Sequence, residues 1–429
     1  MILGTVLLVV FLSQVFWFLR VWRFAGRIKV AFVRHAARGL WVAASVLALT
    51  AFFSNVSFRG TYVNFHNALM VALAGLWISS AMFAYLAVTI VQGIAWLGGL
   101  IRVAIARFMK RVDSPAAPTD NSQAVNVDRR RFLQTSTAVA GAIPFLGAAY
   151  GFGVERFRYE IRDVELAIAG LPTALAGMRI VQLSDLHIGS YMSAGGVRRA
   201  VEMANELGAD LAVVTGDFLT RRGDPLESCI AELSRLRARL GVWGCNGNHE
   251  IYANAETVAE RLFARHGMVL LRQQNVELVH NAQPFNLIGV DYQRQPQGRP
   301  RGQVKLDVIQ PLVRRDVPNI LLSHNPNTFP GAAALGIELM LTGHTHGGQV
   351  RIEILDHHFS PAEFLTPYVA GMYARPLHSS PDLRDPQAWA AEPNAAASVV
   401  YVNRGLGTIG APVRLGVRPE ISLHTLRRA

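Results

Sequence analysis

Long apolar runs alternate with basic segments over the first third of the chain. Four runs without charged residues cover residues 1–19, about 39–56, about 68–98 and about 135–153. Each run is long enough to cross a bilayer as a helix, at a rise of 1.5 Å per residue. The pattern predicts a three-span α-helical membrane region over 1–111 and a fourth span within 112–153.

Positive residues are concentrated in two of the connections between these runs. Segment 20–38 holds six Lys and Arg residues and segment 102–131 holds seven, whereas segment 56–67 has Arg59 alone. Because Lys and Arg are enriched in short cytoplasmic loops, the two basic segments are predicted to be cytoplasmic. The N-terminus and residues 154–429 are then predicted to lie outside a bacterial cytoplasmic membrane that the chain crosses four times.

The basic segment before the fourth run has a recognisable order. Residues 112–128 are rich in Pro, Ser, Asn and Asp, which is typical of a linker. Arg129-Arg130-Arg131-Phe132-Leu133 follows and resembles the twin-arginine export signal. The alternative is an ordinary cytoplasmic anchor of basic residues, which gives the same topology. The internal position, after three earlier spans, departs from the usual N-terminal placement.

After Gly153 the pattern changes to short apolar runs separated by helical segments. Strands are predicted over 178–184, 210–216, 241–245, 285–290, 319–323, 337–342, 398–403 and 420–426, and helices over 197–207, 226–240 and 255–266. Apolar strands that alternate with helices indicate a layered α/β fold. Helical patterns are sparse among the later strands, which favours a second sheet packed on the first.

Charge distribution excludes one class of partner. The chain has 429 residues, of which 51% are hydrophobic and 17% charged, with a net charge of +12. Residues 1–153 contain 14 Lys and Arg against 3 Asp and Glu, whereas residues 154–429 contain 28 against 27. The basicity therefore belongs to the membrane region, and no nucleic-acid partner is expected. Two cysteines, Cys229 and Cys245, leave one optional disulfide open.

Polar residues cluster where the predicted strands end. The segments after five strands read Asp185-Leu186-His187, Gly216-Asp217, Gly247-Asn248-His249-Glu250, Ser323-His324-Asn325 and Gly343-His344-Thr345-His346. Ligands collect at the carboxyl ends of parallel strands in such folds. Carboxylate oxygens and neutral imidazoles suit Mn, Fe or Zn, and the absence of a thiolate cluster argues against a structural zinc site. A lone His at a strand end is more often structural, but the ordered set indicates a metal centre.

This order of motifs resembles the calcineurin-like metallophosphoesterase superfamily. The strings Thr342-Gly-His-Thr-His-Gly-Gly-Gln349 and Tyr401-Val-Asn-Arg-Gly-Leu-Gly407 are similar to its membrane-anchored bacterial phosphodiesterase branch. The resemblance covers about residues 176–427. It implies two facing sheets flanked by helices, a dinuclear centre of divalent metal ions at the strand ends, and a phosphoester substrate.

The same resemblance implies a role for each motif residue. One metal would take Asp185, His187, Asp217 and His346, and the other would take Asp217, Asn248, His324 and His344. Asp217 would bridge the two ions, and His249 would be the general acid or would bind the scissile phosphate. A hydroxide activated by both ions would be the nucleophile. Arg404, in the turn after 398–403, stays open as a residue near the substrate.

Three functions follow for the whole chain. The first is a membrane-anchored, metal-dependent phosphoesterase that acts on a phosphodiester, a phosphomonoester or a lipid-linked phosphoester. The second is a UDP-sugar-lipid pyrophosphatase of envelope lipid synthesis, a reaction expected on the cytoplasmic face. The third is a non-catalytic membrane scaffold, which the complete motif set disfavours. The natural substrate, the native metals and the oligomeric state are open.

Overall fold

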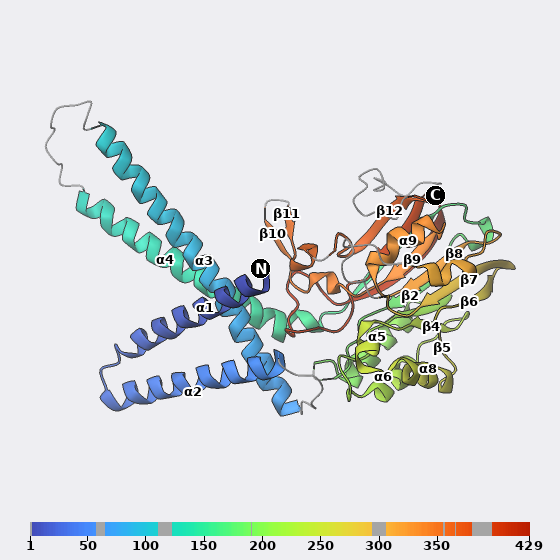
Figure 1. The fold of residues 1–429 in the computed structure, drawn as a ribbon, viewed down its shortest axis with the longest axis horizontal. Coiled ribbons are helices and arrows are strands. Elements are labelled where there is room, and N and C mark those ends of the chain that lie inside the picture. The colour runs from blue at the N-terminus through green and yellow to red at the C-terminus, as the bar shows by residue number, and fades with distance from the viewer. Residues whose placement is uncertain are drawn as a thin grey trace. The chain divides into compact units, whose positions relative to one another are not determined.

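The computed structural model describes residues 2–56, 65–109, 122–189, 191–293, 306–354, 357–364, 366–379 and 397–429 (Figure 1). The chain forms two compact units. The helical unit contains residues 1–59 and 66–150, and the α/β unit contains residues 151–429. Each unit is described by itself below.

The helical unit consists of four long helices, with the bounds α1 Ile2–Ala25, α2 Ala31–Val56, α3 Phe65–Met109 and α4 Ser122–Gly153. Three stretches in the described part are long and apolar enough to cross a membrane, namely Leu7–Ala25, Ala72–Ile105 and Arg130–Phe157. They correspond to the first, third and fourth predicted spans. The α2 side chains are described only as far as Thr50, so the second span stays a prediction.

Helix α4 corrects the predicted linker over 112–128. Residues 112–121 lie outside the described part, but the helix already begins at Ser122. The last proline before the apolar run is Pro118, and no glycine or proline interrupts the sequence from Ser122 to Ala140. Without a helix-breaking residue, the helical pattern extends back from the apolar run through the basic motif.

Aromatic side chains hold α1, α3 and α4 together. The indole N–H of Trp17 in α1 donates to the carbonyl oxygen of Ala81 in α3 at 2.9 Å. The same indole lies edge-on to Phe145 of α4, with ring centroids 5.7 Å apart. Gly141 lets the helices approach, because a Cβ there would lie 3.3 Å from the Trp17 ring. A hydrogen-bonded indole N–H and small neighbours are usual where helices pack in apolar surroundings.

The first sheet of the α/β unit has the strand order β1-β14-β2-β3-β4-β5. Its strands are β1 Glu160–Ile168, β14 Glu420–Arg428, β2 Arg179–Leu183, β3 Leu211–Thr215, β4 Val242–Cys245 and β5 Val269–Leu270. Strands β2 to β5 are parallel, and β14 is antiparallel to β2. Parallel pairing brings the carboxyl ends of β2, β3 and β4 to one edge of the sheet.

The second sheet has the strand order β12-β13-β9-β8-β7-β6. Its strands are β12 Gly371–Pro376, β13 Ala397–Val402, β9 Leu339–Thr342, β8 Asn319–Ser323, β7 Gln283–Val290 and β6 Gln274–His280. Strands β13, β9, β8 and β7 are parallel. A separate hairpin pairs β10 Ile352–Ile354 with β11 His357–Phe359.

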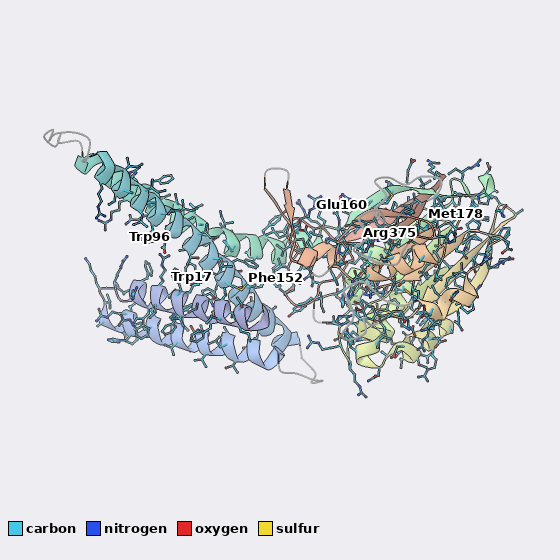
Figure 2. All side chains as sticks on the ribbon, turned by 45° about the horizontal axis from the view of Figure 1, so that its top comes forward. Trp17, Trp96, Phe152, Glu160, Met178 and Arg375 are labelled. Atoms are coloured by element: carbon cyan, nitrogen blue, oxygen red, sulfur yellow. The ribbon has the colours of Figure 1, made fainter. Side chains whose placement is uncertain are left out.

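The two sheets face each other across one apolar core, which confirms the predicted fold. Alternate residues of each strand turn inward, so Leu211 of β3 and Ile320 of β8 share this core with Met178 (Figure 2). Along each strand, the residues that alternate with the inward-facing ones turn toward the outer face of the sheet. Ala212 packs under the helices on one side of the unit, and Leu321 packs under α9 on the other.

Helices cover both outer faces (Figure 1). Helices α5 Ala194–Glu206, α6 Leu226–Leu233 and α8 Glu256–Arg265 cover the first sheet, and α9 Phe329–Ala334 covers the second. The predicted helix 226–240 is wrong beyond Leu233. Asn205 of α5 explains its end, because this side chain binds the Arg235 carbonyl and the Arg237 N–H. Cys229 and Cys245 are buried and free, so the optional disulfide does not form.

Candidate metal centre

The predicted ligands come together at the carboxyl ends of the parallel strands of both sheets. Asp185 and His187 follow β2, Asp217 follows β3, and Asn248 begins the short helix α7 Asn248–Ala253 after β4. His324 follows β8 directly, and His344 and His346 follow β9. The first sheet therefore contributes four of the seven residues and the facing sheet contributes three.

The first group of potential ligands consists of Asp185, His187 and His346. The Nε2 atom of His346 lies 3.3 Å from Asp185 Oδ1 and 3.1 Å from His187 Nε2. All three side chains are buried. Two imidazole nitrogens directed at each other and at a carboxylate form the donor set expected around a divalent cation.

Asp217 connects this group to a second one, formed with His324 and His344. Asp217 Oδ2 lies 3.4 Å from His187 Nε2 and 3.1 Å from His324 Nε2. One carboxylate oxygen thus faces ligands of both groups. This is the position that a residue bridging two ions requires.

Asn248 and His324 each have a buried side-chain atom without a hydrogen-bond partner, and a metal ion could bind both atoms. The Oδ1 atom of Asn248 is buried and has no hydrogen-bond partner, which is costly unless a cation binds it. His324 Nδ1 lies 2.6 Å from the Thr215 carbonyl oxygen, to which it donates. Its Nε2 then presents a lone pair beside Asp217, as ligand histidines do. The residues present therefore fit the metal ions that the motifs imply.

His249 lies next to the ligands but is held differently. Its backbone N–H donates to Asp217 Oδ1 at 2.9 Å, and its Nδ1 donates to the Thr220 carbonyl oxygen at 2.5 Å. Its ring lies edge-on to His187, with centroids 4.7 Å apart. Because Thr220 occupies Nδ1, Nε2 is the ring nitrogen that remains for a substrate or a metal ion. Within the described residues, His249 also belongs to a possible ligand group with His187 and Asp217.

The electrostatic surroundings differ among the histidines. Burial opposes protonation of His324, but the carboxylates of Asp217 and Asp185 outweigh it and raise the pKa of this imidazole to about 10. Burial, with the charge of His324, lowers the pKa of His344 to about 3. Burial also lowers the pKa of His346 and of His249. The three histidines with a lowered pKa stay neutral and retain the lone pair that metal binding needs, whereas His324 must release a proton before it can bind a cation.

Glu250 supports the site, although the sequence motif that includes this residue did not predict a role for it. This buried carboxylate accepts the backbone N–H groups of Asp217, Phe218 and Gly247 at 2.8–2.9 Å. Burial, together with the charge of Asp217, raises its pKa to about 7. Glu250 thereby ties the loop that carries Asp217 to the loop that carries Asn248.

Arg414 is a second supporting residue, and no local motif marks it in the sequence. The guanidinium is fully buried and donates to the carbonyl oxygens of Gly407 and Arg404. The Gly407 N–H in turn donates to the Asp185 carbonyl oxygen at 2.7 Å. Arg404 itself forms an ion pair with Glu420 at 3.3 Å. The pairing supports a structural role for Arg404 rather than contact with a substrate.

Residues 178–348 match the family model described as calcineurin-like phosphoesterase. The chain is 30% identical over 310 residues to a "transmembrane protein with metallophosphoesterase domain" from Danio rerio. The aligned region covers 68% of this chain and 63% of the relative. It is 26% identical to "phosphodiesterase YaeI" from Escherichia coli, over 70% of this chain and 99% of that protein.

A bovine relative with the same description as the Danio rerio protein is 28% identical, over 71% of this chain and 65% of its own length. The chain thus spans somewhat less than two thirds of both vertebrate relatives. The matched segment 178–348 includes every strand end that carries the candidate ligands. Over this segment, the chain is similar to the calcineurin-like phosphoesterase family.

Proposed function

We propose that the protein is a membrane-anchored phosphoesterase that depends on two divalent metal ions. Asp185, His187, Asp217 and His346 would hold one ion, and Asp217, Asn248, His324 and His344 would hold the other. The observation that carries the proposal is the position of Asp217 Oδ2, which faces His187 and His324 at 3.4 and 3.1 Å. The name of the Escherichia coli relative supports a phosphodiester substrate.

Bound metal ions would supply positive charge to the phosphoryl oxygens and lower the pKa of an attacking water. The chain's own residues determine how the substrate is oriented. Glu250 and Thr220 hold the loops on either side of Asp217 and His249. With Nδ1 donating to Thr220, His249 can direct Nε2 at the leaving-group oxygen, and it can donate a proton there when the ring is protonated on both nitrogens.

The proposal includes the location of the centre. The basic segments 20–38 and 102–131 support a multi-pass topology in a bacterial cytoplasmic membrane, with residues 154–429 on the outer face. The Arg129–Leu133 motif supports a twin-arginine export route. A lipid-linked phosphoester is one substrate class that this location offers.

The full chain, purified in detergent, should hydrolyse bis(p-nitrophenyl) phosphate when Mn²⁺ is added, and excess EDTA should abolish the reaction. His324→Asn should lower turnover by at least about a hundredfold, because a ligand to the second ion is weakened. His266→Asn is the matched control, since His266 is exposed at the end of α8. Folded protein without turnover under any divalent cation would favour the scaffold function.

A further inference from the structure

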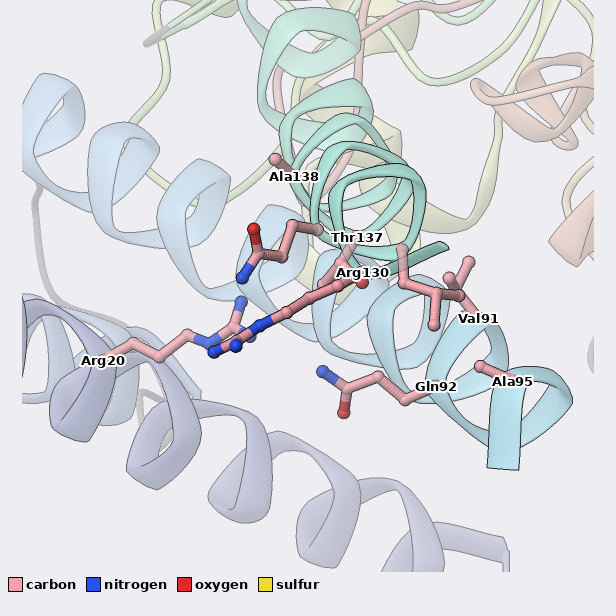
Figure 3. Close-up of a pocket in the computed structure, with 9 residues that line it drawn as sticks. Arg20, Val91, Gln92, Ala95, Arg130, Thr137 and Ala138 are labelled. Atoms are coloured by element: carbon pink, nitrogen blue, oxygen red, sulfur yellow. The ribbon is translucent and has the colours of Figure 1, made fainter. Parts of the chain in front are cut away.

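The helical unit contains an open cavity of about 600 Å³ between α1, α3 and α4 (Figure 3). We call it the arginine cavity, because Arg20 of α1 and Arg130 of α4 extend toward each other within it (Figure 3). Gln92, Gln134 and Thr137 also line it. It lies within the helical unit and shares no residue with the candidate metal centre.

Among the described residues that line the cavity, none is acidic, so none offers the two guanidiniums a negative partner. Residues 1–153 include only Asp113, Asp120 and Asp128 as acidic residues. Arg20 is instead positioned by aromatic rings, because its guanidinium carbon lies 4.8 Å from the centre of the Phe16 ring. Two like charges that converge repel each other, so a bound anion would stabilise this arrangement.

The donor set matches a phosphate group. Arginine presents a planar fork of N–H donors that binds phosphate oxygens in pairs. The side-chain amides of Gln92 and Gln134 and the hydroxyl of Thr137 add neutral donors. The phosphodiester of a phospholipid has two charged, non-bridging oxygens, and two converging guanidiniums can bind both of them.

The other wall of the cavity is apolar. Val91, Ala95, Leu133 and Ala138 provide only hydrocarbon surface there. Arg20 lies near the end of the apolar stretch Leu7–Ala25, and Arg130 begins the stretch Arg130–Phe157. Both arginines are thus at the ends of membrane-spanning segments, where lipid headgroups are found. We propose that the arginine cavity binds an anionic phospholipid, with its phosphate between Arg20 and Arg130.

The test measures lipid binding by the full chain. Because Arg130 also belongs to the twin-arginine-like motif, the protein is made by cell-free synthesis in detergent, which avoids the export route. Native mass spectrometry then compares added phosphatidylglycerol with phosphatidylcholine. Arg20→Gln and Arg130→Gln should each weaken phosphatidylglycerol binding about tenfold, the usual effect of losing a charge-assisted contact.

Arg102→Gln removes the same charge from an exposed position of α3 and should leave the affinity within about twofold. Arg20→Lys keeps the charge without the fork and should give an intermediate loss. Circular dichroism shows whether each variant keeps its helices. Equal binding of the two lipids, or an equal loss in Arg102→Gln, would overturn the proposal. Displacement of phosphatidylglycerol by millimolar inorganic phosphate would reassign the cavity to a soluble anion.

Discussion

At the scale of single residues, five of the seven candidate ligands have a strained backbone. Asp185, His187, Asp217, His344 and His346 all have φ between 48° and 77°, the left-handed region. Residues other than glycine occupy it at a cost of about 1–3 kcal/mol each, and they do so mainly at functional sites. Neighbouring contacts hold the loops in place, such as the Glu250 carboxylate on the Asp217 N–H. We infer that the fold maintains the ligand geometry before any metal ion binds.

Asp217→Asn should lose more metal than any other single-ligand substitution. Replacing the carboxylate by an amide removes the negative charge that faces both groups of ligands. Metal content of the purified full chain, measured by mass spectrometry, checks this. Asp163→Asn, at an exposed position of β1, should keep the full content. Two ions still bound to Asp217→Asn would show that another residue bridges them.

His249→Ala should keep the metal ions and lower kcat by about 10²–10⁴, the usual contribution of a positioned acid. The loss should be smaller for a diester with a p-nitrophenolate leaving group than for one with an alkoxide, because the former needs little protonation. Metal analysis and kcat for both substrates check this. Equal losses would favour phosphate binding over proton donation. Loss of the metal would make His249 a ligand.

The sequence alone predicted which residues meet at the site, but not what holds them there. The motifs place Asp, Asn and His after five strands, and parallel strands bring such ends together. The contribution of Arg414 depends on a hydrogen bond to Gly407 and on the Gly407 contact with Asp185. Such a chain of contacts has no local signature, since Asp185 and Arg414 are far apart in the sequence.

At the scale of elements, close packing between loops controls the centre. Gly343 follows β9, and a Cβ at this position would lie 2.0 Å from Ser184 Oγ and 2.2 Å from Asp185 Oδ2. These atoms belong to the loop after β2, so Gly343 permits the two sheets to bring their ligands together. Gln182 of β2 reinforces the contact, since its amide N–H donates to the Thr342 carbonyl oxygen at 3.0 Å.

Gly343→Ala should therefore reduce metal binding and turnover at least about tenfold, because the added methyl group displaces Asp185. Gly195→Ala is the matched control. Its Cβ would have only an ordinary contact of 3.7 Å with Ser193 Oγ, and alanine favours the α5 helix. Metal content and thermal unfolding of both variants check this. Normal metal content in a folded Gly343→Ala protein would contradict the role assigned to this glycine.

Strand positions were predictable because each apolar run lies in a buried sheet, but their pairing was not. Strand β14 inserts between β1 and β2, antiparallel to β2 and parallel to β1. Its apolar run predicts a strand but does not predict which strands pair with it. The end of α6 was missed for a similar reason, since Asn205 of another helix binds the chain there. Contacts between distant segments decide both features.

At the scale of the whole molecule, the distribution of charge separates two functions. Residues 1–153 carry nearly all of the net positive charge, and residues 154–429 are almost neutral. If the basic segments are cytoplasmic, the centre acts on phosphoesters outside the membrane. If the orientation is reversed, the centre faces the cytoplasm, where synthesis of lipid precursors is expected. The topology therefore decides between the phosphoesterase and the UDP-sugar-lipid pyrophosphatase.

Alkaline phosphatase, which is active only after export, can report this topology in cells. Fusion after Arg158, just before β1, should give high activity, and fusion after Pro118 should give little, because the basic segments keep that connection inside. Immunoblots control for the amount of each fusion protein. Replacing Arg129 and Arg130 by Lys in the first fusion should lower its activity severalfold if the twin-arginine route is used, because a basic anchor would retain its charge. Undiminished activity would make the motif an ordinary anchor. High activity at Pro118 with little at Arg158 would place the metal centre in the cytoplasm.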